Sequence, residues 1–130
     1  MAETTQRPPP PITPETAFYW ASGADGRLRI TQCRSCAALI HPPQPACRYC
    51  RGDQLEISVV SGFATLIGFT VNERFAVPGL PAPYVVAQVA LEEDSRVRLT
   101  TNVIDCDPAD LVLGQRMEVV FEQAGTAWLP

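Results

Sequence analysis

The second half of the chain consists of short runs rich in β-branched and aromatic residues, separated by turn residues. Six such runs are long enough to form strands, at residues 55–62, 63–71, 84–91, 96–104, 116–121 and 126–129. In the run Arg96-Val97-Arg98-Leu99, charged and apolar residues alternate, which is typical of a strand with one wet face. Gly62 and Gly68 fall where a sheet would bend to close on itself. The pattern predicts a mainly β fold, with a five- to six-stranded OB-type barrel over residues 54–130.

The first 25 residues show a different pattern. Residues 1–12 include four consecutive prolines among polar residues, so we expect a disordered, Pro-rich arm. Thr13 followed by Pro14 has the form of a helix N-cap and first helical position, and Gly23 is a plausible stop. Residues 13–25 are therefore predicted to form a short helix. Between the last two long strands, Asp107-Pro108-Ala109-Asp110-Leu111 predicts a capped helical turn.

Four of the five cysteines form two C-x-x-C pairs, at Cys33 and Cys36 and at Cys47 and Cys50. Two residues between thiols let each pair grip one ion from a tight turn, and zinc prefers four sulfurs in a tetrahedron. Residues 26–53 are therefore predicted to form a rubredoxin-like zinc ribbon with a closed, structural site. Iron uses the same ligands and stays a less favoured occupant. A dithiol redox pair fits worse, because such a motif occurs once and in a βαβ context.

Few other residues offer chemistry. The only histidine, His41, lies between the cysteine pairs and is expected to be a loop residue, since four thiolates already complete the site. Cys106 is predicted to be a solitary buried or half-buried thiol with no histidine to activate it. The sequence has no phosphate-cradling glycine loop and no nucleophile elbow, so an enzyme acting alone, such as a free-standing thioesterase, is disfavoured.

Charge is unevenly distributed along the chain. All ten basic side chains are arginines, and the formal net charge is −4. Residues 27–51 carry five arginines and no carboxylate, whereas residues 53–130 carry eleven carboxylates and four arginines. The basic segment would attract a phosphate-bearing partner, or its arginines simply offset the charge of a four-thiolate zinc centre.

Two apolar segments could form contacts outside the predicted core. Phe18, Tyr19 and Trp20 are consecutive, and neighbouring helical positions point about 100° apart, so at least one ring should face outward. They either pack across the join between ribbon and barrel or form a docking surface for a partner. Residues 72–83 form a long apolar loop, in which Phe75, Val77 and Leu80 are candidate partner or acyl-chain contacts.

The order of these features resembles the zinc-ribbon OB-fold accessory proteins of acyl-CoA metabolism, first filed as a domain of unknown function. The resemblance spans residues 13–130. The motifs that carry it are Phe18-Tyr19-Trp20, Gly26-Arg27-Leu28-Arg29-Ile30, the two cysteine pairs with His41-Pro42-Pro43 between them, Ser61-Gly62, Phe69-Thr70-Val71, Pro83-Tyr84-Val85-Val86-Ala87, Thr101-Asn102-Val103, and Gly114 with Val119-Val120-Phe121. One departure is Ala37, at a position that is usually glycine in such knuckles.

This resemblance implies a non-catalytic subunit that assembles with a thiolase, a thiolase-like aldolase or a hydratase, and supports acyl-CoA binding or transfer in lipid or steroid metabolism. Such a role needs a cationic spot for the CoA phosphates, for which Arg34, Arg48 and Arg51 are candidates. The alternative is a nucleic-acid-binding module, because OB barrels and zinc ribbons both serve that purpose. The acidic barrel disfavours it, so no nucleic acid is expected.

The location expected from sequence is the cytoplasm. No apolar run reaches the length of a membrane span, and the N-terminus lacks the apolar core of a signal peptide.

Overall fold

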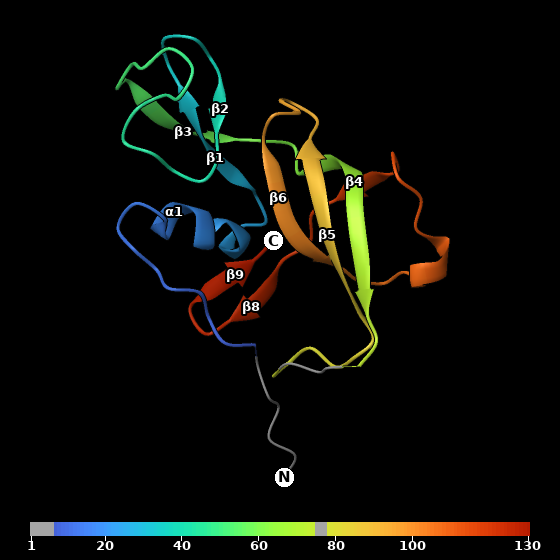
Figure 1. The fold of residues 1–130 in the computed structure, drawn as a ribbon. Coiled ribbons are helices and arrows are strands. Elements are labelled where there is room, and N and C mark those ends of the chain that lie inside the picture. Colours follow the sequence, from blue (N-terminus) through green and yellow to red (C-terminus); the bar gives the residue numbers. More distant parts are fainter. Residues whose placement is uncertain (1–6, 75–77) are drawn as a thin grey trace.

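The predicted mainly β architecture is confirmed, with helical structure confined to short segments (Figure 1). The computed structural model describes residues 7–74 and 78–130. Its elements in chain order are α1 Ala17–Trp20, η1 Ser22–Ala24, β1 Arg29–Cys33, β2 Leu39–Ile40, β3 Leu55–Val59, β4 Phe63–Asn72, β5 Tyr84–Leu91, β6 Arg98–Val103, η2 Pro108–Asp110, β7 Arg116–Glu118, β8 Glu122–Ala124 and β9 Ala127–Leu129. Within these residues the strands form three sheets, ordered β2-β1-β3, β6-β5-β4-β7 and β8-β9.

The N-terminal helix begins later than the sequence predicts. Residues 14–16 form a turn, in which the N–H of Thr16 donates to the Thr13 hydroxyl (3.3 Å) and the N–H of Thr13 donates to the Thr16 hydroxyl (3.0 Å). α1 then starts at Ala17 and leads into η1. The buried Ser22 holds this segment in place, because its hydroxyl donates to the carbonyl of Phe18 (3.2 Å) and accepts from the N–H of Arg29 (3.1 Å).

The ribbon sheet is built on β1, which pairs with β2 on one side and β3 on the other. Thr31 faces Ile40 across the first pair and Ile57 across the second. The run that begins at residue 55 was expected to start the barrel, yet β3 hydrogen-bonds to the ribbon strand β1 along its whole length. The domain boundary between residues 53 and 54 stays a prediction.

The four-stranded sheet forms most of the barrel wall. β4 pairs with β5 and with β7, and β6 lies on the other side of β5. The register of β4 shifts between Leu66 and Gly68, so the expected bend at this glycine is confirmed as a bulge. The alternation in β6 and before it is also confirmed, since Val97 and Leu99 are buried whereas Arg96 and Arg98 are exposed.

The C-terminal segment differs from the prediction. The strand expected over residues 116–121 ends at Glu118, and the final strand is half of a β8-β9 hairpin that turns at Gly125, where φ is 62°. Positive φ favours glycine, which explains the turn. The capped turn after Cys106 is confirmed, since the side chain of Asp107 accepts a hydrogen bond from the N–H of Ala109 (3.0 Å) at the start of η2.

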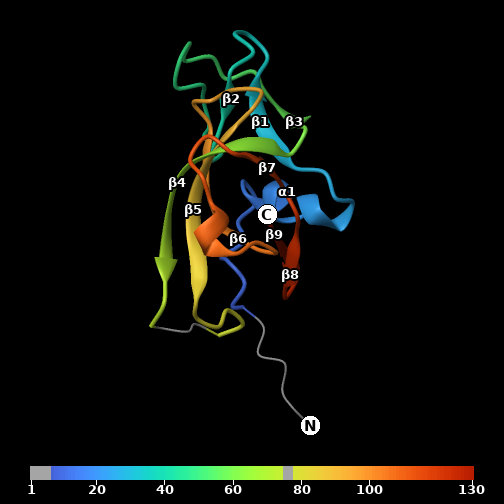
Figure 2. The same cartoon turned by 90° about the vertical axis from the view of Figure 1, so that its right-hand side faces the viewer.

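A single buried cluster joins the helix, the base of the ribbon and the barrel. Tyr19, Leu28, Ile30 and Leu39 share it with fully buried Leu66 of β4. Figure 2 shows the ribbon strands at one end, β4 and β5 below them, and α1 beside β1. The ribbon therefore rests on the barrel through shared apolar packing. In the part of the chain that the structure describes, no helix has the length and apolar character to cross a membrane.

Candidate metal centre

The two C-x-x-C turns bring four thiols together at the tip of the ribbon. All four Sγ atoms lie within 4.8 Å of one another. Sγ of Cys33 is 3.5 Å from Sγ of Cys50, and Sγ of Cys36 is 3.6 Å from Sγ of Cys47. A tetrahedron with Zn–S bonds of about 2.3 Å has sulfurs about 3.8 Å apart. The cluster therefore fits a zinc ion bound by four thiolates. Such an ion would have no open coordination position for a substrate.

Both cysteine pairs lie on turns of the same form. The N–H of Ala37 donates to the carbonyl of Cys33, and the N–H of Arg51 donates to the carbonyl of Cys47, each at 2.9 Å. Ala37 and Arg51 occupy equivalent positions, and both are left-handed, with φ of 65° and 64°. The departure noted in the sequence thus preserves the turn but places a side chain where glycine is favoured.

Backbone N–H donors, neighbouring thiols and burial together shift the pKa of Cys47 down and the pKa of Cys50 up. The N–H groups of Cys50 and Tyr49 lower the pKa of Cys47 to about 6, against the effect of burial. The N–H of Gly52 acts to lower the pKa of Cys50, but the neighbouring Cys33 thiol and burial raise that pKa to about 12. Four thiolates at this spacing repel one another, and a divalent cation removes that repulsion.

Replacing Ala37 with glycine should stabilise the ribbon. A non-glycine residue in the left-handed conformation costs about 1–2 kcal/mol of stability. Glycine removes this cost, but it destabilises the fold by about 0.5–1 kcal/mol because its unfolded state has more conformational entropy. We expect a net gain of about 0.5–1 kcal/mol, measured by hydrogen exchange of the ribbon amides in metal-loaded protein. Ala24→Gly, at an exposed site without positive φ, is the matched control and should destabilise η1. Equal losses in both variants would contradict the strain at Ala37.

Two other candidate residues lie outside the thiol cluster. His41 is half-buried and packs against Tyr19, with ring centroids 4.8 Å apart and the ring planes tilted by 42°, and burial lowers its pKa. Among the described residues, the group that could hold a metal comprises the four cysteines alone. The prediction of a buried or half-buried Cys106 is wrong: this thiol is exposed and donates to the carbonyl of Asp107 (3.4 Å), because its loop lies on the surface.

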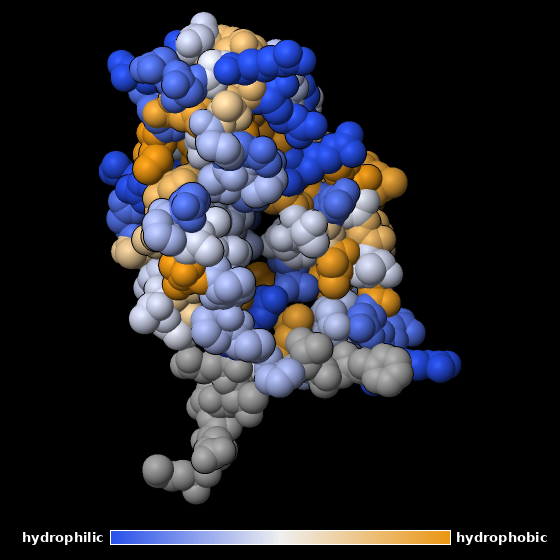
Figure 3. All heavy atoms as spheres, turned by 60° about the vertical axis from the view of Figure 1, so that its left-hand side comes forward, coloured by the Kyte–Doolittle hydropathy of each residue, from blue (hydrophilic) through white to orange (hydrophobic). Residues whose placement is uncertain are grey.

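The candidate CoA-phosphate arginines are all exposed on the ribbon. Arg34 lies 3.7 Å from a carboxylate oxygen of Glu56, whereas no ion pair involves Arg48 or Arg51 within the described residues. The guanidinium of Arg48 is 5.6 Å from the centre of the Tyr49 ring. Figure 3 shows hydrophilic side chains over much of the ribbon, at the top of the molecule, with apolar ones between them.

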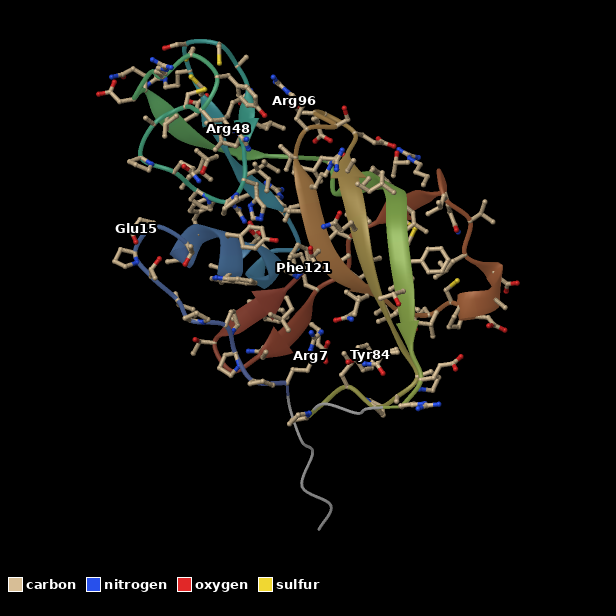
Figure 4. All side chains as sticks on the ribbon, viewed as in Figure 1. Arg7, Glu15, Arg48, Tyr84, Arg96 and Phe121 are labelled. Carbon is tan, nitrogen blue, oxygen red and sulfur yellow. The ribbon has the colours of Figure 1, made fainter. Side chains whose placement is uncertain are left out.

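Sequence reasoning missed a barrel residue that reaches this surface. The guanidinium of Arg96 lies 4.0 Å from the centre of the same Tyr49 ring and is held by Asp94 at 2.8 Å. Arg48 and Arg96 both lie near the junction of ribbon and barrel (Figure 4). Nothing local in the sequence connects these positions, so only the tertiary structure reveals the contact. Tyr49 therefore links the metal turn to the barrel through cation–π packing.

The three consecutive aromatic residues of α1 are buried to different depths. Tyr19 is 7% exposed, so its assignment to a partner surface is corrected: burial in the shared core leaves it no outer face. Phe18 and Trp20 pack against the same core but are only partly buried, so each ring keeps some exposed surface, and their role as a partner surface stays a prediction. Leu80 is partly buried, and the other loop candidates, at residues 75–77, lie outside the described residues.

Two family profiles match consecutive parts of the chain. Residues 20–56 match the ChsH2 rubredoxin-like zinc ribbon domain, and residues 58–122 match the ChsH2 C-terminal OB-fold domain. The chain is also similar to a solved structure described as "Ltp2-ChsH2(DUF35) aldolase", with a TM-score of 0.83 and 29% identity, over 94% of this chain and 95% of that one.

Three curated relatives share about a third of their aligned residues with the chain. A "Probable enoyl-CoA hydratase alpha subunit" of Thermomonospora curvata is 33% identical over 89% of this chain, and a "3-oxo-4,17-pregnadiene-20-carboxyl-CoA hydratase alpha subunit" of Mycobacterium tuberculosis is 32% identical over 86%. The chain spans 35% of each of these two proteins. A "DUF35 domain-containing scaffold protein" of Methanothermobacter thermautotrophicus is 34% identical, over 74% of this chain and 72% of that protein.

Proposed function

Because the chain belongs to the family of ChsH2-type zinc-ribbon and OB-fold proteins, we propose that it is a non-catalytic subunit of an acyl-CoA enzyme complex. Its partner is a thiolase-like aldolase, and the chain supports binding or transfer of the CoA thioester. The observation that carries this proposal is the likeness, over 94% of the chain, to a structure described as an aldolase that contains ChsH2(DUF35). The names of the two hydratase subunits support a CoA thioester as the ligand.

The chemistry of the described residues supports a helper role. The four clustered thiols suit a closed site, which offers a substrate no open coordination position. His41 is packed against Tyr19, and the remaining thiol, Cys106, is exposed with a carbonyl as its partner. Catalytic acids, bases and nucleophiles would therefore come from the thiolase-like partner. We assign zinc to the four cysteines, with iron as the less favoured occupant of the same ligand set.

The exposed ribbon arginines supply the cationic spot for CoA phosphates in this proposal. Arg48 lies between Cys47 and Cys50, and Arg51 directly follows Cys50. Neither makes an ion pair with the described carboxylates, so their charge is available to a ligand. Arg34 lies on the first cysteine turn, and its charge is partly offset by Glu56. A rigid turn that is fixed by a metal ion is a suitable base for phosphate-binding side chains, because it limits the entropy lost on binding.

The complex itself is the first test. The tagged chain, expressed in its native cell, should co-purify with a thiolase-like aldolase in a fixed stoichiometric ratio, as measured by mass spectrometry and light scattering. Isothermal calorimetry of the purified complex with acyl-CoAs should give saturable heat. Recovery of the chain without a thiolase-like or hydratase partner, together with no heat from several acyl-CoAs, would refute the proposed function.

The arginine assignment has its own control. The double charge reversal Arg48→Glu with Arg51→Glu should weaken acyl-CoA binding by the complex at least about tenfold, because charge-assisted phosphate contacts are lost. Arg74→Glu reverses a single charge, on the loop after β4. It should leave the affinity for acyl-CoA within about twofold of the unmodified protein. Equal affinities for all three proteins would exclude the ribbon arginines as the phosphate site.

A further inference from the structure

The barrel contains an open cavity between two strands that do not pair. In the sheet order β6-β5-β4-β7, β6 and β7 are the two edges, so the wall has a gap between them. A cavity of about 250 Å³ lies in this gap. Ala64 of β4 and Val89 of β5 line it, as do Thr101 of β6 and Met117 of β7. The cavity is therefore part of the barrel interior and is separate from the thiol cluster at the ribbon tip.

Most of the lining is apolar, and apolar residues reach from the interior to the mouth. Buried Ala64, Val89 and Leu99 contribute to it, and the small side chain of Ala64 leaves space that a larger residue would fill. Ile104 and Val120 also line the cavity, and they are 51% and 53% exposed. Exposed apolar residues that continue into an apolar interior form a path along which an apolar group can enter.

Polar groups in the lining are either already bonded or negatively charged. The Thr101 hydroxyl donates to the carbonyl of Pro130 (2.8 Å), and the Asn102 side-chain amide donates to the carbonyl of Val85 (2.8 Å). The charged members of the lining are Asp105 and Glu118, both exposed. No arginine is among the described residues that line the cavity. An anionic group would therefore be repelled at the mouth, whereas an uncharged one would not.

The volume limits the size of the occupant. A cavity of about 150 Å³ accepts a benzene ring, and each water occupies about 30 Å³ in the liquid. If each carbon of an acyl chain takes about the volume of a water molecule, a cavity of about 250 Å³ accommodates a chain of roughly six to eight carbons. The burial of each methylene contributes about 0.8 kcal/mol, so such a chain gains enough for weak, reversible binding.

We propose that this cavity binds an uncharged acyl chain of about six to eight carbons, inserted between β6 and β7 past Ile104 and Val120. The identification of this ligand as the acyl chain of a CoA thioester rests on the proposed function. The acyl group of such a thioester carries no charge. A free fatty acid has the same hydrocarbon but a carboxylate, which would meet Asp105 and Glu118. The ribbon and the barrel would then bind different parts of one thioester: the ribbon arginines its phosphates, and the cavity its acyl chain.

Methyl NMR of the isolated full chain tests this binding directly. Hexanoyl-N-acetylcysteamine, a neutral thioester, should produce saturable shifts of the Val89, Leu99 and Val119 methyl signals. The methyl signals of Ile57 and Val59 on the outer strand β3 should not move. Hexanoate should bind at least about tenfold more weakly than the neutral thioester. The absence of saturable shifts at the cavity methyls, or equal binding of the two probes, would overturn the proposal.

Cavity-filling variants provide the second test. Val119→Phe should weaken binding of the neutral thioester at least about tenfold by occupying the cavity, and Val59→Phe, the same change at an exposed position on β3, should have no effect. Val120→Trp at the half-exposed mouth is the variant to use if Val119→Phe does not fold, and it should have the same effect. Unchanged affinity in the folded plugging variant would refute the site. Since no partner enzyme is present, a negative result overturns the cavity and leaves co-purification of the complex as the test of the proposed function.

Discussion

Removal of the metal should unfold the tip of the ribbon while the barrel keeps its structure. Among the described residues, the buried cluster around the thiols contains only Ala38 and Ile40 besides Cys33 and Cys47, with Leu55 packed against it. So few apolar side chains cannot stabilise a fold unaided, whereas metal binding contributes about 10–16 kcal/mol in zinc-finger peptides. Amide signals of residues 33–50 should collapse to random-coil values in NMR spectra after mild unfolding and refolding with a chelator. Signals from the base of β1 should persist, because Leu28 and Ile30 belong to the barrel core.

Two cysteine variants separate the metal effect from a general effect of thiol loss. Cys47→Ser should reproduce the chelator spectrum and lose the metal, since it removes a buried ligand candidate. Cys106→Ser changes an exposed thiol outside the cluster and should leave both the spectrum and the metal content unchanged. Elemental analysis should find zinc or iron in a near-unit ratio to the native chain. A folded ribbon tip in metal-free protein would contradict the assignment.

The substitution Gly23→Ala should cause a large loss of stability at a residue outside the thiol cluster. A Cβ atom at this position would overlap Cβ of Trp128 and approach Cβ and Cγ of Phe121 to 2.8 Å. Atoms so close to the backbone cannot move aside unless the β8-β9 hairpin moves away from η1. Overpacking of this kind costs about 2–3 kcal/mol, which lowers the Tm by roughly 8–12 °C in a chain of this size.

Gly68→Ala is the matched control for this prediction. No heavy atom lies within 4 Å of a Cβ built at Gly68, and φ there is not positive. The free energy of unfolding should therefore change by no more than about 0.5 kcal/mol. Both variants are measured by thermal unfolding of the metal-loaded protein followed by circular dichroism. Equal Tm values for Gly23→Ala and Gly68→Ala would show that the hairpin adjusts freely and that η1 is not tightly packed on it.

Features with a local cause were predictable from the sequence. The cluster of Cys33, Cys36, Cys47 and Cys50 follows from spacing, because each pair needs only one tight turn. The limits of β5 follow from its run of β-branched residues. β8 was missed because Glu122-Gln123-Ala124 has no β-branched or aromatic residue, so its pairing with β9 is the only reason that it forms a strand.

Features that depend on distant parts of the chain were not predictable. The apolar pattern of residues 55–59 indicates a strand but not its partner, and β3 pairs with β1 although the two are separated by the whole metal-binding segment. Strand pairing is set by register and packing across the sheet, which local propensity does not contain. The stacking of Arg96 on Tyr49 and the burial of Tyr19 have the same origin. The chemistry at the ribbon tip was thus easier to predict than the surface around it.

The short connection between β3 and β4 limits how the two halves can be oriented. Only residues 60–62 separate these strands, and the N–H of Val60 donates to the carbonyl of Leu28 within the shared core. The ribbon and the barrel therefore have a fixed relative orientation and are not joined by a flexible linker. A partner enzyme that binds the arginine-rich tip of the ribbon would also fix the orientation of the open side of the barrel. Little orientational entropy would then be lost when the barrel forms its own contact.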